Sequence, residues 1–225
     1  MIQKTIGVVS LILMIAALYL IFMYVGVDAA QGDPYRILYF HIPLNIMGYL
    51  SGILLGAASI AFLSSSAPKW DSYGAVAAEL GFLTAGAGLM SGMMWAKPIW
   101  GAYWVWWDVR LNLQLILVLL FAAYLMLRAY LPPGEKRATL SCVFGILAMI
   151  DVPFNYLVLY FVPTKQHPGA VVSPGGGGVD SDMAITFMVS LTAWCMFYAW
   201  LFGRRSALAR LEDEVDHLEQ LVQQS

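Results

Sequence analysis

The sequence predicts an all-α, polytopic membrane protein with six transmembrane helices, both termini cytoplasmic, and a short amphipathic cytoplasmic C-terminal helix. Three observations support this fold class. The 225-residue chain is 60% hydrophobic and only 12% charged, whereas a soluble domain carries about a quarter charged residues. Its apolar residues gather in runs of about 20, the length that one bilayer crossing requires. Its Lys and Arg residues are shared unequally between the two sets of loops, which predicts an orientation.

Six apolar runs are long enough to span a membrane. They extend approximately over Thr5 to Val25, His41 to Leu63, Tyr73 to Met94, Leu111 to Leu131, Thr139 to Val162 and Met183 to Phe202. We therefore expect a six-helix membrane domain over residues 1–203, followed by a separate tail over residues 204–225.

Because the number of crossings is even, both termini are expected on one side. Eight basic residues fall on that side, namely Lys4, Lys69, Arg128, Lys136, Arg137, Arg204, Arg205 and Arg210. Four fall opposite, namely Arg36, Lys97, Arg110 and Lys165. The positive-inside rule places the termini in the cytoplasm and the segment after the third run outside.

That external segment, residues 95–110, reads WAKPIWGAYWVWWDVR and holds five of the eight tryptophans. If the chain is helical from Trp100 onward, Trp100, Trp104 and Trp107 share one face, with Asp108 at its edge. Such an aromatic shelf would suit a large flat apolar ligand such as a porphyrin, because indole rings offer wide stacking surfaces. The alternative is an interfacial aromatic belt that binds no ligand.

Two of the three histidines are expected on the same external side. His41 stands at the membrane boundary with Pro43 at the head of the next helix, and His167 follows the fifth helix between two prolines. Haem iron can be held by two imidazoles on opposite faces of the ring, so two loops could clamp one porphyrin. Each histidine could instead be a structural interfacial residue, and His217 in the charged tail is most simply solvated.

Arg36 and Arg110 are candidates for binding the haem propionates, because guanidinium binds carboxylate through two hydrogen bonds. Both could instead be charges that end a helix near lipid head groups. Lys97 and Lys165 are weaker candidates for the same role.

Two carboxylates, Glu79 and Asp151, lie inside apolar runs, where an ionised group facing lipid costs several kcal/mol. They could form a proton or substrate pathway, or they could make hydrogen bonds between helices. Glycines in the third run are expected at close helix contacts, namely Gly81, Gly86, Gly88 and Gly92.

The tail places apolar residues at spacings of three and four, namely Leu208, Leu211, Val215, Leu218 and Val222. This spacing predicts an amphipathic helix of about four turns with an acidic opposite face. The acidic face disfavours binding to an anionic bilayer, so a short coiled coil with another subunit is expected.

The segment WGAYWVWWDVRL, with His41 in RILYFHIP and His167 in the third external loop, resembles the tryptophan-rich WWD haem-handling proteins of cytochrome c biogenesis. Six helices and about 225 residues resemble the CcmC family most closely, whereas the tryptophans alone would also fit the larger relatives CcmF and CcsA. The resemblance covers Thr5 to Phe202. One departure is that Trp107 stands between Trp106 and Asp108, where the family pattern has Asp directly after W-x-W; on a helix this would rotate the carboxylate by about 100°.

The resemblance implies non-covalent, transient binding of haem b, with His41 and His167 as axial ligands. It implies that the ring is held by the tryptophan segment, through Trp100, Tyr103, Trp104, Trp106, Trp107 and Asp108. It further implies delivery to a CcmE-like periplasmic haem chaperone, with a CcmD-like small membrane protein and a CcmAB-like ABC transporter as partners. The expected location is the bacterial inner membrane, with no nucleic acid partner. No catalysis is required, although a haem lyase-like role stays open.

Two other functions compete with haem delivery. A secondary transporter would use Glu79 and Asp151 as a proton path and would be expected to show an internal repeat, for which the sequence gives no convincing sign. A structural subunit of a membrane complex would dock partners through its tail and its tryptophan belt.

Overall fold

The computed structural model describes residues 2–162 and 180–224, and within these ranges the chain forms helices and no named strand. The six long helices are α1 (Ile2–Tyr19), α2 (Leu38–Ser65), α3 (Pro68–Trp100), α4 (Val109–Tyr130), α5 (Glu135–Phe161) and α6 (Ser181–Gln224). A π-helical turn, η1 (Leu20–Tyr24), continues α1, and a 3-10 turn, η2 (Asp33–Ile37), precedes α2. Six segments are long and apolar enough to cross a membrane, which confirms the predicted multi-pass fold.

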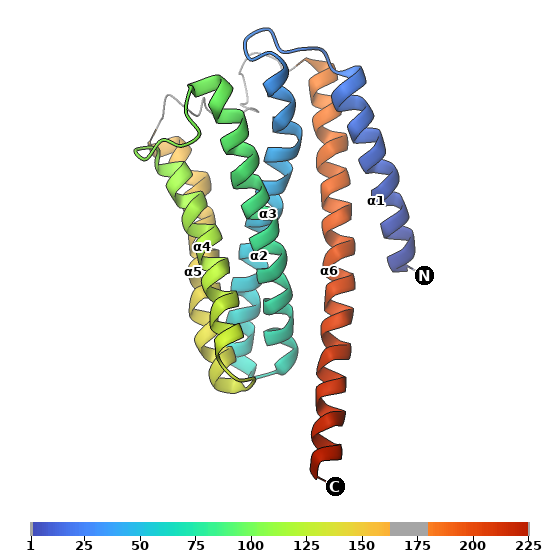
Figure 1. The fold of residues 1–225 in the computed structure, drawn as a ribbon, viewed down its shortest axis with the longest axis vertical. Coiled ribbons are helices and arrows are strands. Elements are labelled where there is room, and N and C mark those ends of the chain that lie inside the picture. Colours follow the sequence, from blue (N-terminus) through green and yellow to red (C-terminus); the bar gives the residue numbers. More distant parts are fainter. Residues whose placement is uncertain (1, 163–179, 225) are drawn as a thin grey trace.

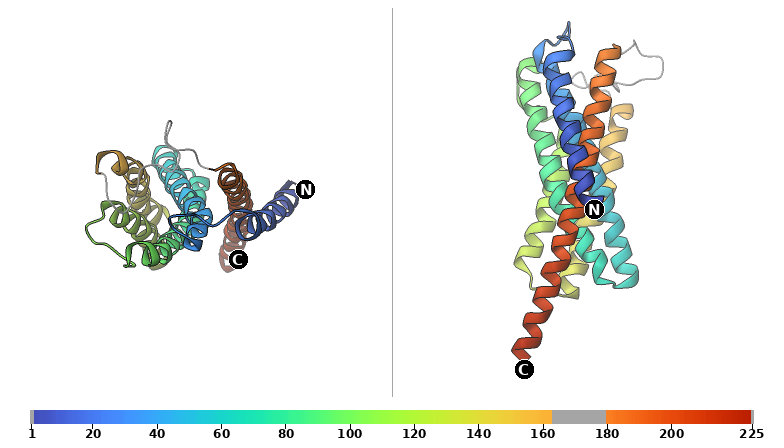
Figure 2. Two further views of the ribbon diagram at one scale, coloured as in Figure 1. Left: turned by 90° about the horizontal axis from the view of Figure 1, so that it is seen from above. Right: turned by 90° about the vertical axis from the view of Figure 1, so that its right-hand side faces the viewer.

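Helices α2 to α5 form an antiparallel four-helix bundle, and α6 packs on its side against α2 and α3 (Figure 1). Helix α1 lies at the periphery against α6, as the view from above shows (Figure 2). Many apolar side chains of α1 are exposed, which suits contact with lipid. The bundle core is built from small and aromatic side chains, with Leu117 and Phe121 completely buried.

The two ends of the bundle differ in their loops. We call the end that carries residues 25–37 and 101–108 the tryptophan end, and the end that carries residues 66–67 and 131–134 the opposite end. The C-terminal end of α5 and the start of α6 also lie at the tryptophan end (Figure 1).

Of the four glycines expected at close helix contacts, three lie at such contacts. A Cβ added at Gly81 would clash with Phe121, one at Gly88 would lie 2.6 Å from Asn45 Oδ1, and one at Gly92 would lie 2.7 Å from His41 Cε1. These approaches are too short for a side chain, so glycine lets the helices pack closely. Gly86 was predicted wrongly, because a Cβ there would meet nothing within 4 Å.

Two helix ends differ from the expectations. Helix α3 continues past Met94 to Trp100, so Trp95 and Trp100 belong to a helix rather than to a loop. Helix α6 runs without a break across residues 203 and 204 to Gln224, so the amphipathic tail is an extension of the sixth helix rather than a separate one (Figure 1).

Candidate ligand site at the tryptophan end

His41 lies in the first turns of α2 and packs against α3. Its Nδ1 is 2.9 Å from the Gly88 carbonyl oxygen and 3.3 Å from Ser91 Oγ. A carbonyl oxygen only accepts hydrogen bonds, so Nδ1 carries a proton, and in a neutral ring the lone pair is then on Nε2. Metal-binding histidines commonly show this arrangement, in which the second ring nitrogen donates to a carbonyl and orients the ring.

Asn45 and Gly92 complete the surroundings of the His41 ring. The Asn45 amide donates to the His41 carbonyl at 2.8 Å, and its nitrogen lies 3.3 Å from each ring nitrogen. Because Gly92 has no side chain, the ring can lie directly against the backbone of α3. Asn45 was not predicted; its place one helical turn after His41 was the only local signal.

The start of α2 differs from the prediction that Pro43 lies in the first turn. Helix α2 begins at Leu38, so Pro43 lies in the second turn, where its missing N–H leaves the Tyr39 carbonyl without its usual helical partner. The Ser190 hydroxyl of α6 donates to that carbonyl instead. The contact therefore links the helix that carries His41 to α6.

Trp95 lies one turn beyond Ser91 and Gly92 on α3, and therefore on the same side as the His41 contact. Its side chain is buried, and its Nε1 donates to Gln31 Oε1 in the first loop at 2.9 Å. The Trp100 ring meets it edge to face, with centroids 5.1 Å apart. Trp95 is thus held one helical turn beyond the residues that His41 contacts, and Trp100 packs on it.

The predicted helical shelf of Trp100, Trp104 and Trp107 is wrong. Gly101 has φ 78° and ends α3, and residues 101–108 form an irregular loop that turns the chain into α4. Only eight residues join two antiparallel helices here, so a further helical turn would carry the chain away from the bundle. The tryptophans of the loop therefore do not share one helical face.

Within this loop, Trp106 and Trp107 are the most exposed aromatic side chains, at 71% and 79%. Trp104 meets Trp106 edge to face with centroids 5.6 Å apart, and its Nε1 is buried with no hydrogen-bond partner among the described residues. Tyr103 is half exposed, with the Lys97 ammonium 5.2 Å above its ring. The loop therefore offers a large aromatic surface outside the bundle.

Asp108 does not lie at the edge of a shelf but is fully buried and caps α4. Its Oδ1 accepts hydrogen bonds from the backbone N–H groups of Arg110 at 3.0 Å and Leu111 at 3.1 Å. The loop is further fixed by Asn112, whose amide donates to the Trp106 carbonyl at 2.7 Å. The rotation expected from the extra Trp107 does not apply, because this segment is not helical.

The two arginines lie at the same end but in different surroundings. Arg36 donates to the carbonyls of Ile21 and Val25 at the end of η1 and pairs with Asp33 at 3.2 Å. These contacts hold the first loop against the end of α1, so a structural role accounts for Arg36. Arg110 lies in the first turn of α4, with its guanidinium near the Tyr49 hydroxyl of α2. Propionate binding stays a prediction for both.

His167 and Lys165 lie outside the described residues, so the predicted pairing of His41 with His167 stays a prediction. His217 lies on the C-terminal extension of α6 and not at the tryptophan end.

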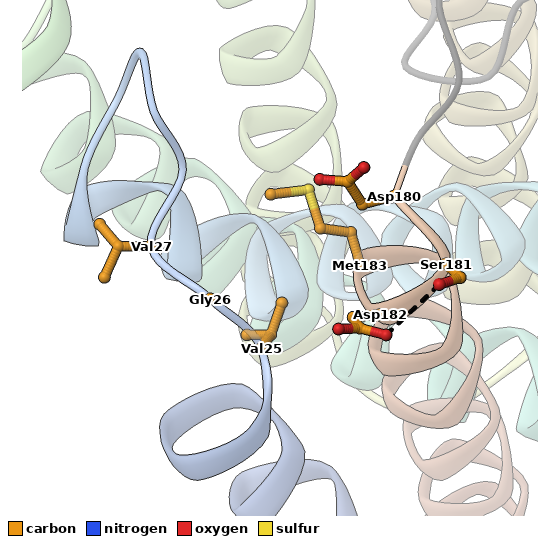
Figure 3. A pocket seen from close by; sticks show the side chains of 7 residues that line it. All are labelled: Val25, Gly26, Val27, Asp180, Ser181, Asp182 and Met183. Carbon is orange, nitrogen blue, oxygen red and sulfur yellow. Dashed lines mark hydrogen bonds between the residues drawn. The ribbon is translucent and has the colours of Figure 1, made fainter.

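A cavity of about 250 Å³ lies beside the first loop at the start of α6 (Figure 3). It is lined by Val25, Gly26, Val27, Asp180, Ser181, Asp182 and Met183. Tyr24 donates to Asp182 at 2.9 Å beside it. The cavity is smaller than the usual 300–1,000 Å³ of ligand pockets and contains none of the predicted site residues, so we do not assign the ligand to it.

The intramembrane carboxylates have separate partners. Glu79 accepts two hydrogen bonds from Arg205 of α6, at 2.6 and 2.9 Å. Of its two interpretations, the structure therefore favours hydrogen bonding between helices. Asp151 is buried and accepts from Asn155 on its own helix at 2.6 Å. The printed partner of Glu79 lies on α6 and that of Asp151 on α5 itself, which gives no support to a shared proton path.

Six spanning helices with an oriented histidine and an exposed aromatic loop at one end define a polytopic membrane protein. The chain belongs to the CcmC family: the family model described as Heme exporter protein C matches residues 1–220. This is a family of haem-handling membrane proteins rather than of catalytic enzymes.

Individual relatives agree with this assignment. A ccmC-like mitochondrial protein of cytochrome c biosynthesis from Marchantia polymorpha is 30% identical over 169 residues, covering 75% of this chain and 71% of that protein. Heme exporter protein C of Bradyrhizobium diazoefficiens is 27% identical over 191 residues, covering 84% and 69%. Heme exporter protein C of Escherichia coli is 33% identical over 144 residues, covering 63% and 56%.

Proposed function

We propose that this protein binds haem at the tryptophan end, on the periplasmic face of a bacterial inner membrane, and delivers it to a CcmE-like haem chaperone during c-type cytochrome biogenesis. Membership of the CcmC family supports haem as the cargo. The observation that carries the assignment to this end is the orientation of His41, whose Nδ1 is bound to the Gly88 carbonyl.

In this proposal His41 Nε2 binds the iron from one face of the ring. The Gly88 carbonyl increases the basicity of the imidazole and holds it in one tautomer, which favours ligation before haem arrives. His167 is proposed as the ligand on the other face, and two imidazoles are a known haem ligand pair. The bond is non-covalent, so haem b can leave again.

Aromatic side chains hold the porphyrin in two ways. Trp95 and Trp100 are fixed near His41 and form the inner wall, while Trp106 and Trp107 extend from the bundle and cover an outer face. Stacking on indoles stabilises a flat ring without closing its edges. Arg110 is the first choice for a propionate, because Arg36 already holds the first loop.

A carrier of this design needs partners on both sides of the transfer. The CcmE-like chaperone would approach the exposed tryptophans and take the haem by exchanging one axial ligand. A CcmD-like small membrane protein and a CcmAB-like ABC transporter are proposed as neighbours in the bilayer, as the family assignment suggests. No bond of the porphyrin has to be made or broken by this chain.

Absorbance of the purified protein tests the ligand. Wild type from haem-replete cells should show a Soret band, and His41→Ala should lose most of it; His217→Ala is the matched control that keeps it. An unchanged Soret band in His41→Ala would disprove this ligand. Wild type that never carries haem would disprove the cargo.

Transfer tests the outer tryptophans separately. Trp106→Ala with Trp107→Ala should lower the yield of haem-loaded chaperone in coexpressing cells by about tenfold, since the two lost stacking contacts together remove about 1.4 kcal/mol. Tyr130→Ala is the control, because Tyr130 is 88% exposed at the opposite end. Equal yields from all three proteins would exclude the proposed docking surface.

A further inference from the structure

The extension of α6 carries an apolar stripe that is largely exposed. Leu208, Leu211, Val215, Leu218 and Val222 are each 50–74% exposed. Figure 1 shows this part of α6 continuing well beyond the other helices. At 1.5 Å per residue a helix of 44 residues is about 66 Å long, roughly twice the hydrocarbon core that α6 has to cross.

The spacing of the stripe is that of a coiled coil. Steps of three and four residues alternate from Leu208 to Val222, which puts these side chains at successive a and d positions of a heptad. With Leu208 at an a position, the flanking e and g positions include residues 212, 214 and 219, and all three are glutamates. The seam is therefore apolar, and its flanks are acidic.

The base of this extension is held firmly. Arg205 binds Glu79 of α3 at 2.6 Å and Glu212 of the next turns of α6 at 3.0 Å. Ala209 is buried and joins a cluster with Val76 of α3, while Leu208 and Leu211 face away. The helix thus leaves the bundle in a fixed direction, and its first turns need no separate nucleation.

The negative charge of the tail determines which kind of helix can pack on the apolar stripe. After Arg210 the chain has five acidic residues and no Lys or Arg. A second copy of this chain would place glutamates opposite glutamates in either direction, and like charges at e and g positions oppose pairing. An anionic bilayer is disfavoured for the same reason.

We propose that residues 207–224 form a two-stranded coiled coil with a basic amphipathic helix of another protein, which has Leu, Ile or Val at its core positions and Lys or Arg at its flanks. The interaction lies on the side of the membrane away from the tryptophan end. It is independent of haem, because the tail and the tryptophan end lie at opposite ends of the molecule.

Designed peptides test the proposal with full-length protein in detergent micelles. The probe is a four-heptad peptide with Leu at a and d and Lys at e and g; the controls are a scrambled peptide of the same composition and one with Glu at e and g. We expect the lysine peptide to bind and the glutamate peptide not to bind. Equal binding of the lysine and scrambled peptides would mean that charge alone causes the binding, which would contradict the coiled coil.

Two variants separate the seam from its flanks. Leu211→Gln with Leu218→Gln keeps the charge and should weaken lysine-peptide binding by about tenfold or more, because two core leucines are lost. Glu214→Lys with Glu219→Lys should shift the preference toward the glutamate peptide. Unchanged binding in the first variant, or tail-dependent dimers of the wild type, would refute the proposal. The Soret band should stay unchanged in both variants.

Discussion

The two ends of the bundle use charged and polar side chains differently. At the opposite end, charges pair between helices: Asp71 of α3 with Arg128 of α4, and Glu79 of α3 with Arg205 of α6. At the tryptophan end, Arg36 donates to two backbone carbonyls and His41 to one, beside contacts with polar side chains. One end is tied together by ion pairs, while the other uses its polar groups to orient side chains and shape loops.

Because of this difference, we expect the two ends of the bundle to have different roles. Ion pairs with two hydrogen bonds fix helix positions strongly, because a partly buried charge is costly once its partner is lost. Contacts to carbonyls set the direction of a ring or a loop without binding the helices to one another as tightly. In the proposed function, the tryptophan end would receive and release haem while the opposite end stays assembled.

The largest effect is expected from Arg128→Ala at the opposite end. It leaves Asp71 without its partner in a site where the two side chains are only 14% and 20% exposed, so we expect a loss of about 3 kcal/mol of unfolding free energy. Unfolding by SDS in mixed micelles measures it. The more exposed Glu79–Arg205 pair, at 35% and 29%, gives the comparison, and Arg205→Ala should cost about 1 kcal/mol.

Equal losses in Arg128→Ala and Arg205→Ala would mean that burial does not decide the strength of these pairs. If neither variant loses unfolding free energy, ion pairs do not distinguish the opposite end from the tryptophan end. Haem content should change little in both proteins, provided that they are purified in the folded state.

An intermediate effect is expected from Gly92→Ala at the tryptophan end. The new Cβ would lie 2.7 Å from His41 Cε1 and force the ring out of its place, so haem affinity should fall by about tenfold, or 1.4 kcal/mol. Gly86→Ala on the same helix is the matched control, because its Cβ would meet nothing within 4 Å. Haem titration followed at the Soret band measures the haem affinity of both variants. Equal affinities would mean that the position of the His41 ring does not affect haem binding.

The helices were predictable from sequence because apolar length is a direct requirement of the bilayer. All six were found, and the close contacts of Gly81, Gly88 and Gly92 followed from the preference of packed membrane helices for small residues. The tryptophan loop was mispredicted although Gly101 directly follows Trp100, and glycine at this position is a common sign of a helix end.

Other features had no local signal. Gly88 lies 47 residues from His41, and Glu79 lies 126 residues from Arg205. Such partners depend on which helices become neighbours, which apolar spacing alone does not specify. The histidine could be proposed as a ligand from its residue type, but the proton on Nδ1 follows only from the carbonyl that the folded chain places beside it.

The smallest effect is expected at Asp108, which separates a local structural role from a ligand role. Asp108→Ala removes the acceptor for two N–H groups at the start of α4 and should cost about 1 kcal/mol of unfolding free energy. Asp108→Asn keeps an oxygen acceptor and should cost much less, because Asn and Asp cap helices about equally well. If stability stays near wild type in Asp108→Asn and haem affinity also stays, the carboxylate serves the helix alone. If haem affinity falls while stability stays, the negative charge contributes to the ligand site, and the tryptophan end would depend on electrostatics more than its contacts with backbone carbonyls suggest.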